Sequence, residues 1–515
     1  MSDQKNFYIT TPIYYVNDVP HIGHAYTTLA CDVLARFKRL SGYNVMFLTG
    51  TDEHGQKVEK SALAAEIPPQ EFCDNVSSRF NELASAMNFS NDQFIRTTED
   101  RHKKAVQHLW KTLEEKGFIY ADSYAGWYSV RDEAFYAEKE LIEGEGSEKL
   151  APTGAPVEWV EEPSYFFKLS AFEDQLIEWY ETSEGAVQPK SRLNEVKSFV
   201  KGGLEDLSIS RTTFSWGVPV PGNDKHIMYV WIDALTNYLT AIGYPDMENE
   251  DYKAFWPADV HMVGKDILRF HAVYWPAFLM AADLPLPKRV FAHGWWTNEG
   301  QKISKSLGNV IDPFELIDSY SLDAVRYFLL HEVPFGNDGD FSRQSFVNRS
   351  NAALANGIGN FAQRSLSMVH KNCDGKVPQP GEFTDEDKAF LEGLDSVLAE
   401  MTEHMDNQAF HKAFDALWKQ VTAADGYIST QEPWKLKKAD PQRMETVLYI
   451  CVEAVRQLSI LMQPIMPDSC AKMLDQMSVS ERGFDQLGVK GRMQAGTAIP
   501  KPEGVYPRFE LPAEE

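Results

Sequence analysis

The chain has 515 residues, of which 43% are hydrophobic and 24% are charged, and its formal net charge is −25. This composition excludes an intrinsically disordered chain, because it holds enough apolar residues to form large buried cores. The acidic excess argues against a protein that coats DNA or membranes, since such binding needs a surplus of lysine and arginine, but it leaves room for a local basic site.

The N-terminal segment predicts a strand, a helix and a second strand. Residues 6–13 are rich in aromatic and β-branched side chains, which favour a strand. A helix is expected from His24 to the Ser41-Gly42 pair, and residues 45–48 predict a short buried strand. The apolar side chains that share one face of this helix are Leu29, Val33, Phe37 and Leu40. This order predicts the opening of a parallel α/β sheet.

Residues 121–220 differ in composition from the segments around them. They hold nine basic and nineteen acidic residues, with turns rich in Gly, Glu and Pro. We interpret them as an insertion that divides one α/β domain. Strands of that domain are expected to resume at residues 226–230, 260–263 and 289–292.

From about residue 345 onward, helical patterns replace the β-rich runs, as in residues 389–399 and 446–455. They predict a helical C-terminal domain. Five scattered cysteines form no CxxC pair, which is typical of a reducing compartment. No signal peptide and no long apolar span is present. We therefore expect a cytoplasmic protein that has no membrane partner.

A His-Ile-Gly-His motif at residues 21–24 stands between the first strand and its helix. A helix N-terminus favours an anion such as phosphate, because it presents free N–H groups and the positive end of the dipole. Gly23 would let a ligand approach the backbone, and two imidazoles three residues apart can donate to phosphate oxygens. The alternative is that the histidines only cap or pack. The spacing differs from that of an HExxH zinc protease.

A Lys-Ile-Ser-Lys-Ser motif at residues 302–306 follows Gly300 and predicts a mobile loop that closes on polyphosphate. Taken alone, such a motif is more often a solvated basic loop. The two motifs together, one after the first strand and one after the last strand of a single α/β domain, are more specific than either is by itself.

These motifs resemble the HIGH and KMSKS signatures of the class I aminoacyl-tRNA synthetases. Four further segments look like active-site blocks of the methionyl-tRNA synthetase family, namely residues 11–17, 47–55, 229–234 and 264–271. Pro433-Trp434 is similar to the family's anticodon-reading element. The resemblance covers nearly the whole chain.

The resemblance implies a methionine-tRNA ligase that forms methionyl-adenylate from L-methionine and ATP, with Mg²⁺, and then charges the 3′-terminal adenosine of tRNA(Met). AMP and pyrophosphate are released. The implied segments are residues 1–120 and 221–325 as the two halves of a Rossmann-like catalytic domain, 121–220 as a connective insertion, and 326–515 as a helical stem-contact and anticodon-binding domain.

The resemblance also implies site residues. The catalytic residues would be His21, His24, Lys302 and Lys305, and ATP would also contact Gly23, Gly264, Asp266 and Ser304. The methionine pocket would be formed by Ile13, Tyr15, Asp52, Trp231, Ala234, Leu235, Tyr238, Ile267 and His271, with Asp52 facing the ammonium group. The anticodon would be read by Asn356, Asn360, Arg364 and Trp434. Asp266 could instead cap a helix, the two asparagines could be local polar packing, and Arg364 is by itself more often an ordinary surface charge.

The chain departs from the family at three places. Ser129 and Asp132 stand where many members have a CxxC zinc knuckle, and no cysteine lies between Cys73 and Cys373, so we predict no structural zinc. Ile303 replaces the usual Met of the second signature, a change that conserves volume. No appended dimerising domain is expected, which favours a monomer, and DNA is not an expected partner.

Two other hypotheses concern a catalytically silent relative and a different class I synthetase. Both histidines of the first motif and both lysines of the second are present, which argues against the silent relative. A cysteine-specific enzyme would need thiolate zinc ligands in its pocket, and no suitable cysteine lies there.

Overall fold

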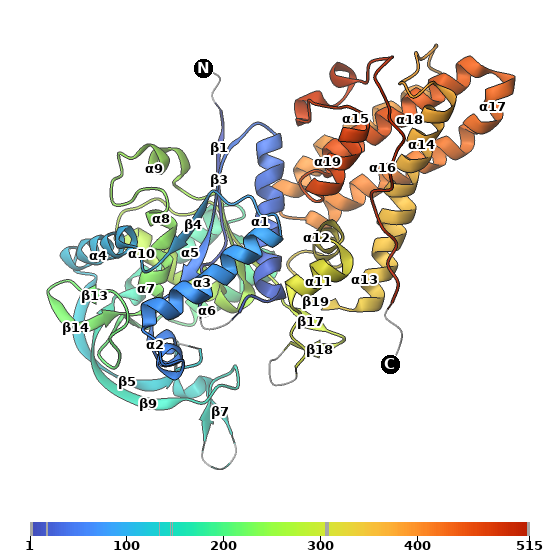
Figure 1. Cartoon of the computed structure of the whole chain (residues 1–515). Helices are drawn as coiled ribbons and strands as arrows, with labels where there is room; N and C mark the ends of the chain where they lie inside the picture. The colour runs from blue at the N-terminus through green and yellow to red at the C-terminus, as the bar shows by residue number, and fades with distance from the viewer. Residues whose placement is uncertain are drawn as a thin grey trace. The chain divides into compact units, whose positions relative to one another are not determined.

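The computed structural model describes residues 4–16, 19–132, 134–144, 146, 148–303 and 308–511 (Figure 1). Its contacts divide the chain into two compact units. The sheet unit comprises residues 6–20 and 45–293, and the helical unit comprises residues 1–5, 21–44 and 294–515. Each unit is therefore assembled from segments that are separated in the sequence.

The sheet unit is built around a seven-stranded sheet with the strand order β10-β16-β15-β1-β3-β2, in which β4 also pairs with β3. Its strands are β1 (Asn6–Thr10), β2 (Tyr14–Tyr15), β3 (Asn44–Asp52), β4 (Gln93–Arg96), β10 (Val187–Gln188), β15 (Val260–Gly264) and β16 (Val290–His293). β15 pairs in parallel with β1 and β16, and β3 pairs in parallel with β2 and β4. The predicted parallel α/β sheet is confirmed, together with the strands expected at 260–263 and 289–292.

The helices of the sheet unit connect these strands and share a core with them. They are α2 (Gln56–Ala64), α3 (Pro69–Ala86), α4 (Asp100–Glu115), α5 (Glu173–Thr182), α6 (Lys190–Lys201), α7 (Val230–Leu235), α8 (Asn237–Thr240), α9 (Glu250–Phe255) and α10 (Trp275–Ala281). One hydrophobic cluster includes Tyr8 of β1, Trp110 of α4 and Trp275 of α10, all fully buried. This cluster joins the sheet to most of these helices, whereas Val58 of α2 and Cys73 of α3 belong to a separate small cluster.

An antiparallel sheet also belongs to this unit. The long strands β5 (Ile119–Ser129) and β9 (Glu158–Phe167) pair from Ile119 opposite Phe167 to Tyr128 opposite Glu158. β6 (Ala134–Tyr136) and β11 (Leu207–Ser208) complete the sheet. The short strands β7 (Ile142–Glu143) and β8 (Lys149–Leu150) form a separate hairpin.

The strand expected at residues 226–230 does not belong to the parallel sheet, so that prediction is wrong. β14 (Asn223–Met228) pairs antiparallel with β12 (Ser210–Arg211) and β13 (Pro219–Val220), and the chain enters α7 at Val230. A short apolar run predicts a strand but does not distinguish its pairing direction.

The helical unit begins with α1 (Ile22–Leu40), which ends at Ser41 as predicted but starts two residues before His24. α1 packs against α12 (Leu322–His331). Arg326 of α12 donates to Asp32 of α1 at 2.6 Å, and both side chains are fully buried. Arg326 also donates to the carbonyl of Ile465, so this ion pair links α1 to the end of the helical bundle.

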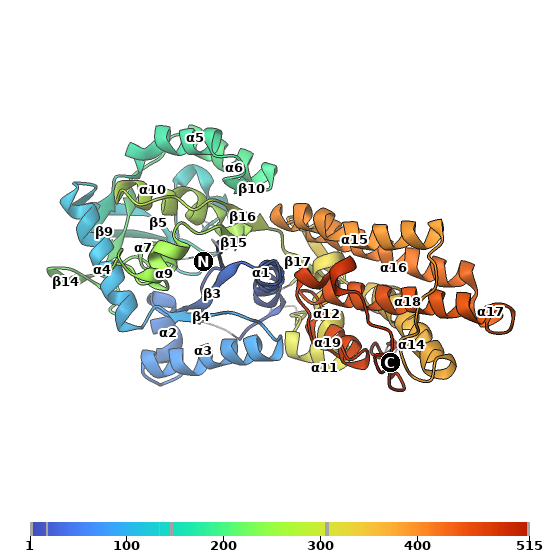
Figure 2. The same cartoon turned by 90° about the horizontal axis from the view of Figure 1, so that it is seen from above.

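The bundle consists of helices that lie side by side (Figure 2). Its elements are α13 (Arg343–Ser350), the π-helix η6 (Asn351–Gly359), α14 (Asn360–Asn372), α15 (Asp385–Asp406), α16 (Phe410–Gln431), α17 (Pro433–Ala439), α18 (Pro441–Met462) and α19 (Pro467–Gln476). α18 is buried from Thr446 to Met462 and contacts α14, α15 and α16. The helices predicted at 389–399 and 446–455 are confirmed within α15 and α18.

Further elements of the helical unit lie between α1 and the bundle in the sequence. They are β17 (Trp296–Asn298), β18 (Gln301–Lys302), α11 (Pro313–Tyr320) and β19 (Gly339–Phe341). In the part of the chain that the structure describes, no helix is long and apolar enough to cross a membrane.

Candidate active site

The first turn of α1 is closed by the two histidines of the HIGH motif. His21 is the N-cap residue, and its Nδ1 accepts the backbone N–H of Gly23 at 3.1 Å. Nδ1 of His24 accepts the backbone N–H of His21 at 3.1 Å, and the ring centroids are 3.9 Å apart. This is a capping box made by imidazoles, so the capping interpretation of the motif holds for both histidines.

The caps determine which ring nitrogen carries the proton. Because each Nδ1 accepts a hydrogen bond, the neutral tautomer of each ring has its proton on Nε2. Burial, reinforced by the charge of His21, holds the pKa of His24 well below its usual range, so this ring is neutral near pH 7. The motif therefore combines capping through Nδ1 with an N–H donor at Nε2.

Gly23 is required by the position of the first imidazole. A Cβ atom at this position would lie 2.9 Å from Cε1 of His21, closer than real contacts allow. No acidic residue occupies the first turn of α1, so the positive end of the helix dipole is not compensated there. Gly23, which was predicted to let a ligand approach the backbone, is therefore also needed for the His21 ring to cap the helix.

The start of the KISKS loop is held by a hairpin. β17 and β18 pair antiparallel through Thr297 opposite Lys302, and the turn between them has positive φ at Glu299 and Gly300. Asn309 donates to the carbonyl of Lys302 at 3.1 Å, which brings the chain after the loop back to the end of β18. Ser304 and Lys305 lie outside the described residues.

One backbone hydrogen bond connects the HIGH motif to the segment that follows the KISKS motif. The N–H of Ile22, in the first turn of α1, donates to the carbonyl of Ile311 at 3.2 Å. Ile311 follows the last residue of the KISKS motif by five positions. The first turn of α1 and this segment both belong to the helical unit.

The predicted ribose contacts stand at the carboxyl end of a parallel strand in the sheet unit. Gly264 is the last residue of β15, and Asp266 lies in the short helix η3 (Lys265–Ile267) that follows. A Cβ on Gly264 would lie 2.5 Å from Oδ1 of Asp266, so the close approach of this carboxylate needs a glycine. Gly264, not Asp266, is the N-cap residue of η3, which does not support the capping alternative for Asp266. The carboxyl edge is where ligands bind to such sheets.

The predicted methionine residues also lie in the sheet unit. Asp52 ends β3, is 3% exposed and pairs in register with Tyr15 of β2. Trp231 of α7 stacks on Phe270 with 3.6 Å between ring centroids. The remaining predicted members are either buried or packed against the same apolar cluster: Ile13, Ala234, Leu235, Tyr238, Ile267 and His271.

His271 is held neutral by burial. Its Nδ1 donates to the carbonyl of Ile267 at 2.9 Å, so its Nε2 accepts the hydroxyl hydrogen of Tyr238 at 2.7 Å. Burial lowers the pKa of His271 to about 4, although the hydrogen bond to Ile267 and the charge of Asp266 act in the opposite direction. A protonated ring could not accept from Tyr238.

This pKa predicts a loss of stability in acid. Between about pH 6.5 and about pH 4 the unfolded chain binds a proton at His271 and the folded chain does not, so the free energy of unfolding falls as the pH falls. The contribution is about 3 kcal/mol when the full range is crossed. Urea denaturation at several pH values should show a smaller fall for His271→Asn, whose amide can still donate to Ile267. Equal slopes for the two proteins would contradict the assignment.

The predicted anticodon residues come from three helices of the bundle, η6, α14 and α17. The guanidinium of Arg364, in α14, lies 5.8 Å from the ring centroid of Trp434, in α17, and donates to Asp425 at 2.9 Å. Trp434 is 46% exposed. Asn360 shares α14 with Arg364, but Asn356 lies in the π-helix η6, which has a non-helical backbone at Gly357. The regular spacing expected for all three polar residues is therefore interrupted.

The buried ionisable residues that were not predicted from the sequence include a group of three in the sheet unit. Asp233, in α7, contacts both His54 and His102. His54 and Asp233 lie within residues 47–55 and 229–234, two of the segments that resemble active-site blocks, so the sequence offered a signal for them. His102 has no such local signal.

The segment at Ser129 and Asp132 is stabilised by hydrogen bonds. The N–H of Asp132 donates to Oγ of Ser129 at 3.2 Å, and Arg131 donates to the carbonyl of Thr153 at 2.9 Å. Among the residues described, no group of three or more His, Cys, Asp or Glu side chains is arranged to hold a metal ion. A zinc-free knuckle remains a prediction.

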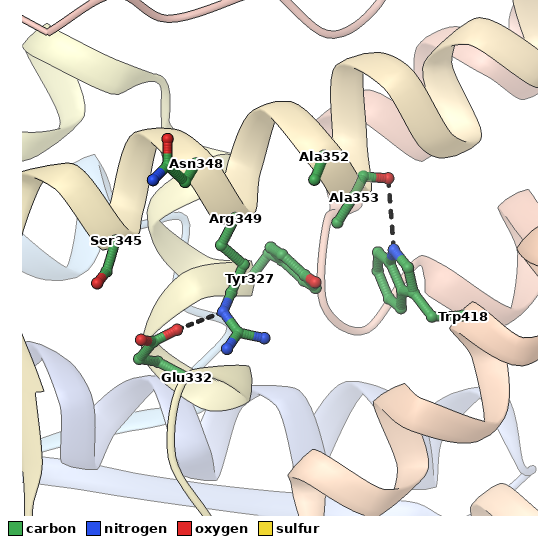
Figure 3. A pocket seen from close by; sticks show the side chains of 8 residues that line it. All are labelled: Tyr327, Glu332, Ser345, Asn348, Arg349, Ala352, Ala353 and Trp418. Carbon is green, nitrogen blue, oxygen red and sulfur yellow. Dashed lines mark hydrogen bonds and ion pairs between the residues drawn. The ribbon is translucent and has the colours of Figure 1, made fainter.

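A cavity of 590 Å³ lies in the helical unit, at α12, α13 and α16. Figure 3 shows the guanidinium of Arg349 directed at Glu332, and the indole of Trp418 donating to the carbonyl of Ala353. Tyr327 stacks on Trp418 with 4.5 Å between ring centroids. Because the charges of Arg349 and Glu332 compensate each other, this cavity offers no net positive charge to a phosphate group.

Comparison with known proteins agrees with these features. A family model described as tRNA synthetases class I (M) matches residues 7–366, and a model described as the anticodon binding domain of methionyl tRNA ligase matches residues 377–511. The methionine–tRNA ligase of Brucella suis biovar 1 (strain 1330) is 55% identical over 511 residues, which is 99% of each chain. That of Rhizobium meliloti (strain 1021) is 55% identical over 515 residues, covering 99% of this chain and 100% of the relative.

Solved structures show the same similarity. Mycobacterium tuberculosis methionyl-tRNA synthetase in complex with methionyl-adenylate has a TM-score of 0.96 at 51% identity, and the match covers 98% of this chain and 100% of that chain. The apo form of that protein has a TM-score of 0.89 at 49% identity, with 99% of both chains covered.

Proposed function

The chain belongs to the methionine-specific class I tRNA synthetases, and from this premise we propose which of its residues perform each step of the reaction. That reaction is ATP-dependent ligation of L-methionine to tRNA. Methionine is first converted to methionyl-adenylate with release of pyrophosphate. The methionyl group then passes to the 3′-terminal adenosine of tRNA(Met), and AMP is released.

Activation of methionine is assigned to the two motifs of the helical unit. The methionine carboxylate attacks the α-phosphorus of ATP, so negative charge accumulates on the phosphate oxygens. We assign the Nε2–H groups of His21 and His24 and the ammonium groups of Lys302 and Lys305 to these oxygens. The observation that supports this assignment is the Ile22–Ile311 hydrogen bond, which joins the first turn of α1 to the segment that follows the KISKS motif.

ATP would also be held by Gly23, Gly264, Asp266 and Ser304. Gly264 and Asp266 stand at the carboxyl end of β15, where the ribose would be held. Mg²⁺ would enter with ATP, because this ion prefers phosphate oxygens and retained waters to an all-protein cage. We expect no structural zinc, and we propose a cytoplasmic monomer.

The amino acid would be held by a carboxylate and an apolar wall. The carboxylate of Asp52 would pair with the substrate ammonium group, and the aromatic and aliphatic side chains around Trp231 suit a polarisable thioether. His271 and Tyr238 would complete this wall through their mutual hydrogen bond. The shape of methionine would then be read without an editing site.

Methionine-dependent ATP–pyrophosphate exchange tests this function directly. We expect exchange with methionine and far weaker exchange with leucine or cysteine. Exchange supported by another amino acid but not by methionine would overturn the assignment, and absence of any exchange would favour a catalytically silent relative.

Anticodon reading is assigned to Asn356, Asn360, Arg364 and Trp434. The exposed indole of Trp434 offers a stacking surface to an unpaired base, and the asparagines and Arg364 offer hydrogen bonds to base edges. Residues 341–380, which contain three of these four side chains, carry five basic and one acidic residue. This gives the acidic chain a local basic path for RNA.

Replacing Trp434 by alanine should weaken tRNA charging and leave pyrophosphate exchange nearly intact. Loss of one stacked base corresponds to about 1–3 kcal/mol, or roughly a 5-fold to 150-fold loss in kcat/KM for tRNA. The exposed Trp159 of β9 provides a matched control, because Trp159→Ala removes an exposed indole from the sheet unit. Equal losses of charging and exchange in Trp434→Ala would remove this residue from the proposed role.

A further inference from the structure

Asp233 is the centre of a buried hydrogen-bond network in the sheet unit. Its Oδ2 accepts from Nδ1 of His54 at 2.7 Å, and its Oδ1 accepts from Nε2 of His102 at 2.8 Å. The side chains of Asp233, His54 and His102 are 1%, 3% and 0% exposed. A charge buried so deeply needs strong compensation.

His102 has a second contact in this network, because its Nδ1 lies 3.1 Å from the hydroxyl oxygen of Thr240. Burial alone would raise the pKa of Asp233, but the charge of His54 and the hydrogen bonds of both histidines hold it well below its usual range. The carboxylate is therefore ionised and paired.

The network joins elements that carry the proposed methionine contacts. His54 follows Asp52 by two residues, in the segment after β3. Asp233 follows Trp231 by two residues, in α7. The bond between His54 and Asp233 thus connects the segment of the ammonium anchor to the helix of the apolar wall. His102 supports the same carboxylate from α4.

The segment after β3 is also held from its other side. The fully buried carboxylate of Glu53 accepts two hydrogen bonds from Arg96, at 2.6 and 3.0 Å. The carbonyl of Glu53 accepts the indole N–H of Trp216 at 2.5 Å, and the N–H of Gly55 donates to the carbonyl of Trp216 at 3.0 Å. Glu53 and Gly55 are held by these contacts. Between them, His54 bonds to Asp233 and so joins the segment that follows Asp52 to α7.

We propose that Asp233 is a positioning residue that determines specificity, because through His54 it fixes the separation between Asp52 and the apolar wall of α7. An amino acid held by its ammonium group at one end and by its side chain at the other is then selected for length. This inference rests on the proposed roles of Asp52 and Trp231. A displacement of about 1 Å can cost on the order of 100-fold in rate.

The test measures exchange with methionine, with S-methylcysteine, which is one methylene shorter, and with ethionine, which is one methylene longer. In Asp233→Asn we expect KM for methionine to rise on the order of 10-fold to 100-fold, and KM for ATP to change little. The preference for methionine over the two analogues should fall at least about 5-fold, since one methylene is worth about a factor of 10–200 in an intact pocket.

Two variants of His54 separate the bond from general disruption. In His54→Asn the amide occupies the place of Nδ1–H and can still donate to Asp233, so this variant should recover most of the preference. In His54→Gln the amide extends toward the place of Nε2, so this variant should behave like Asp233→Asn. Because His54→Gln removes only one of the two bonds, it keeps the test available if Asp233→Asn does not fold.

A matched control is Asp387→Asn in the helical unit. Asp387 is also fully buried and is paired with Arg443 and Tyr427, so its loss should lower Tm without changing the preference for methionine. If Asp233→Asn and His54→Gln lower Tm but leave KM for methionine and the preference unchanged, the network is only structural and the proposal is wrong. If Asp52→Asn leaves KM for methionine unchanged as well, the proposed anchor itself has failed.

Discussion

Replacing His24 by asparagine should lower kcat of methionine-dependent pyrophosphate exchange on the order of 100-fold to 1,000-fold, with little change in either KM. The imidazole has two functions that this substitution separates. Its Nδ1 accepts the N–H of His21 and closes the first turn of α1, and its Nε2–H is the proposed donor to the phosphate. Asparagine can retain the acceptor at the place of Nδ1 but has no group that reaches the place of Nε2.

Two further variants make this prediction specific. His24→Gln places an amide donor near the Nε2 position and should keep more of kcat than His24→Asn. His24→Ala removes the cap as well as the donor, so it should lower Tm in addition, by the amount expected for a lost cap of about 1 kcal/mol. If His24→Asn keeps full kcat, or if its loss of kcat is fully explained by a lower Tm, then His24 only caps the helix.

The neutral state of His24 has a kinetic consequence. A ring whose pKa is held far below 6.5 by burial keeps its Nε2–H throughout the usual assay range, so donation does not depend on protonation near neutral pH. In the proposed role, His24 would be a neutral donor whose tautomer is set by a backbone N–H. This arrangement resembles an oxyanion hole more than a titrating acid.

The sequence contains the local information for the HIGH helix and for four strands of the parallel sheet, β1, β3, β15 and β16. The end of α1 at Ser41 and strands β15 and β16 follow from turn residues and apolar runs. The pairing of β14 did not follow, because its partners are selected by tertiary contacts and not by its own composition. The start of α1 at Ile22 was also missed, because His21 is an unusual cap residue.

The candidate site divides in the same way. Residues within contiguous motifs, such as His21 and Lys302, could be predicted because the chemistry and the spacing are local. The Asp233 network could not, because its bonds connect residues 179 and 131 positions apart in the sequence. His102 occurs in an ordinary amphipathic helix, and only the folded sheet unit places its ring beside a carboxylate.

Asp52→Asn is the substitution expected to affect methionine binding most. Asparagine keeps the shape of the side chain and removes its charge, so the substrate ammonium group would be buried opposite a neutral amide. Removing one partner of a buried ion pair costs about 3–5 kcal/mol, which corresponds to roughly a 150-fold to 4,000-fold loss in kcat/KM for methionine. KM for ATP should change little, because the lost contact is to the amino acid. Steady-state exchange kinetics with each substrate varied in turn measures both values.

A double-mutant cycle with the substrate decides whether Asp52 contacts the ammonium group. The analogue 4-methylthiobutanoate keeps the carboxylate and thioether of methionine but lacks the amino group. The wild-type enzyme should activate the analogue with a much lower kcat/KM than methionine. In Asp52→Asn the difference in kcat/KM between methionine and the analogue should be much smaller, which corresponds to a coupling energy of at least about 2 kcal/mol. Asp387→Asn, which removes a buried carboxylate far along the sequence, should show no coupling. If the effect of the Asp52→Asn substitution and the effect of removing the amino group add to within about 0.5 kcal/mol, the ammonium group lies elsewhere. The distance that Asp233 is proposed to fix would then have a different substrate atom at its end.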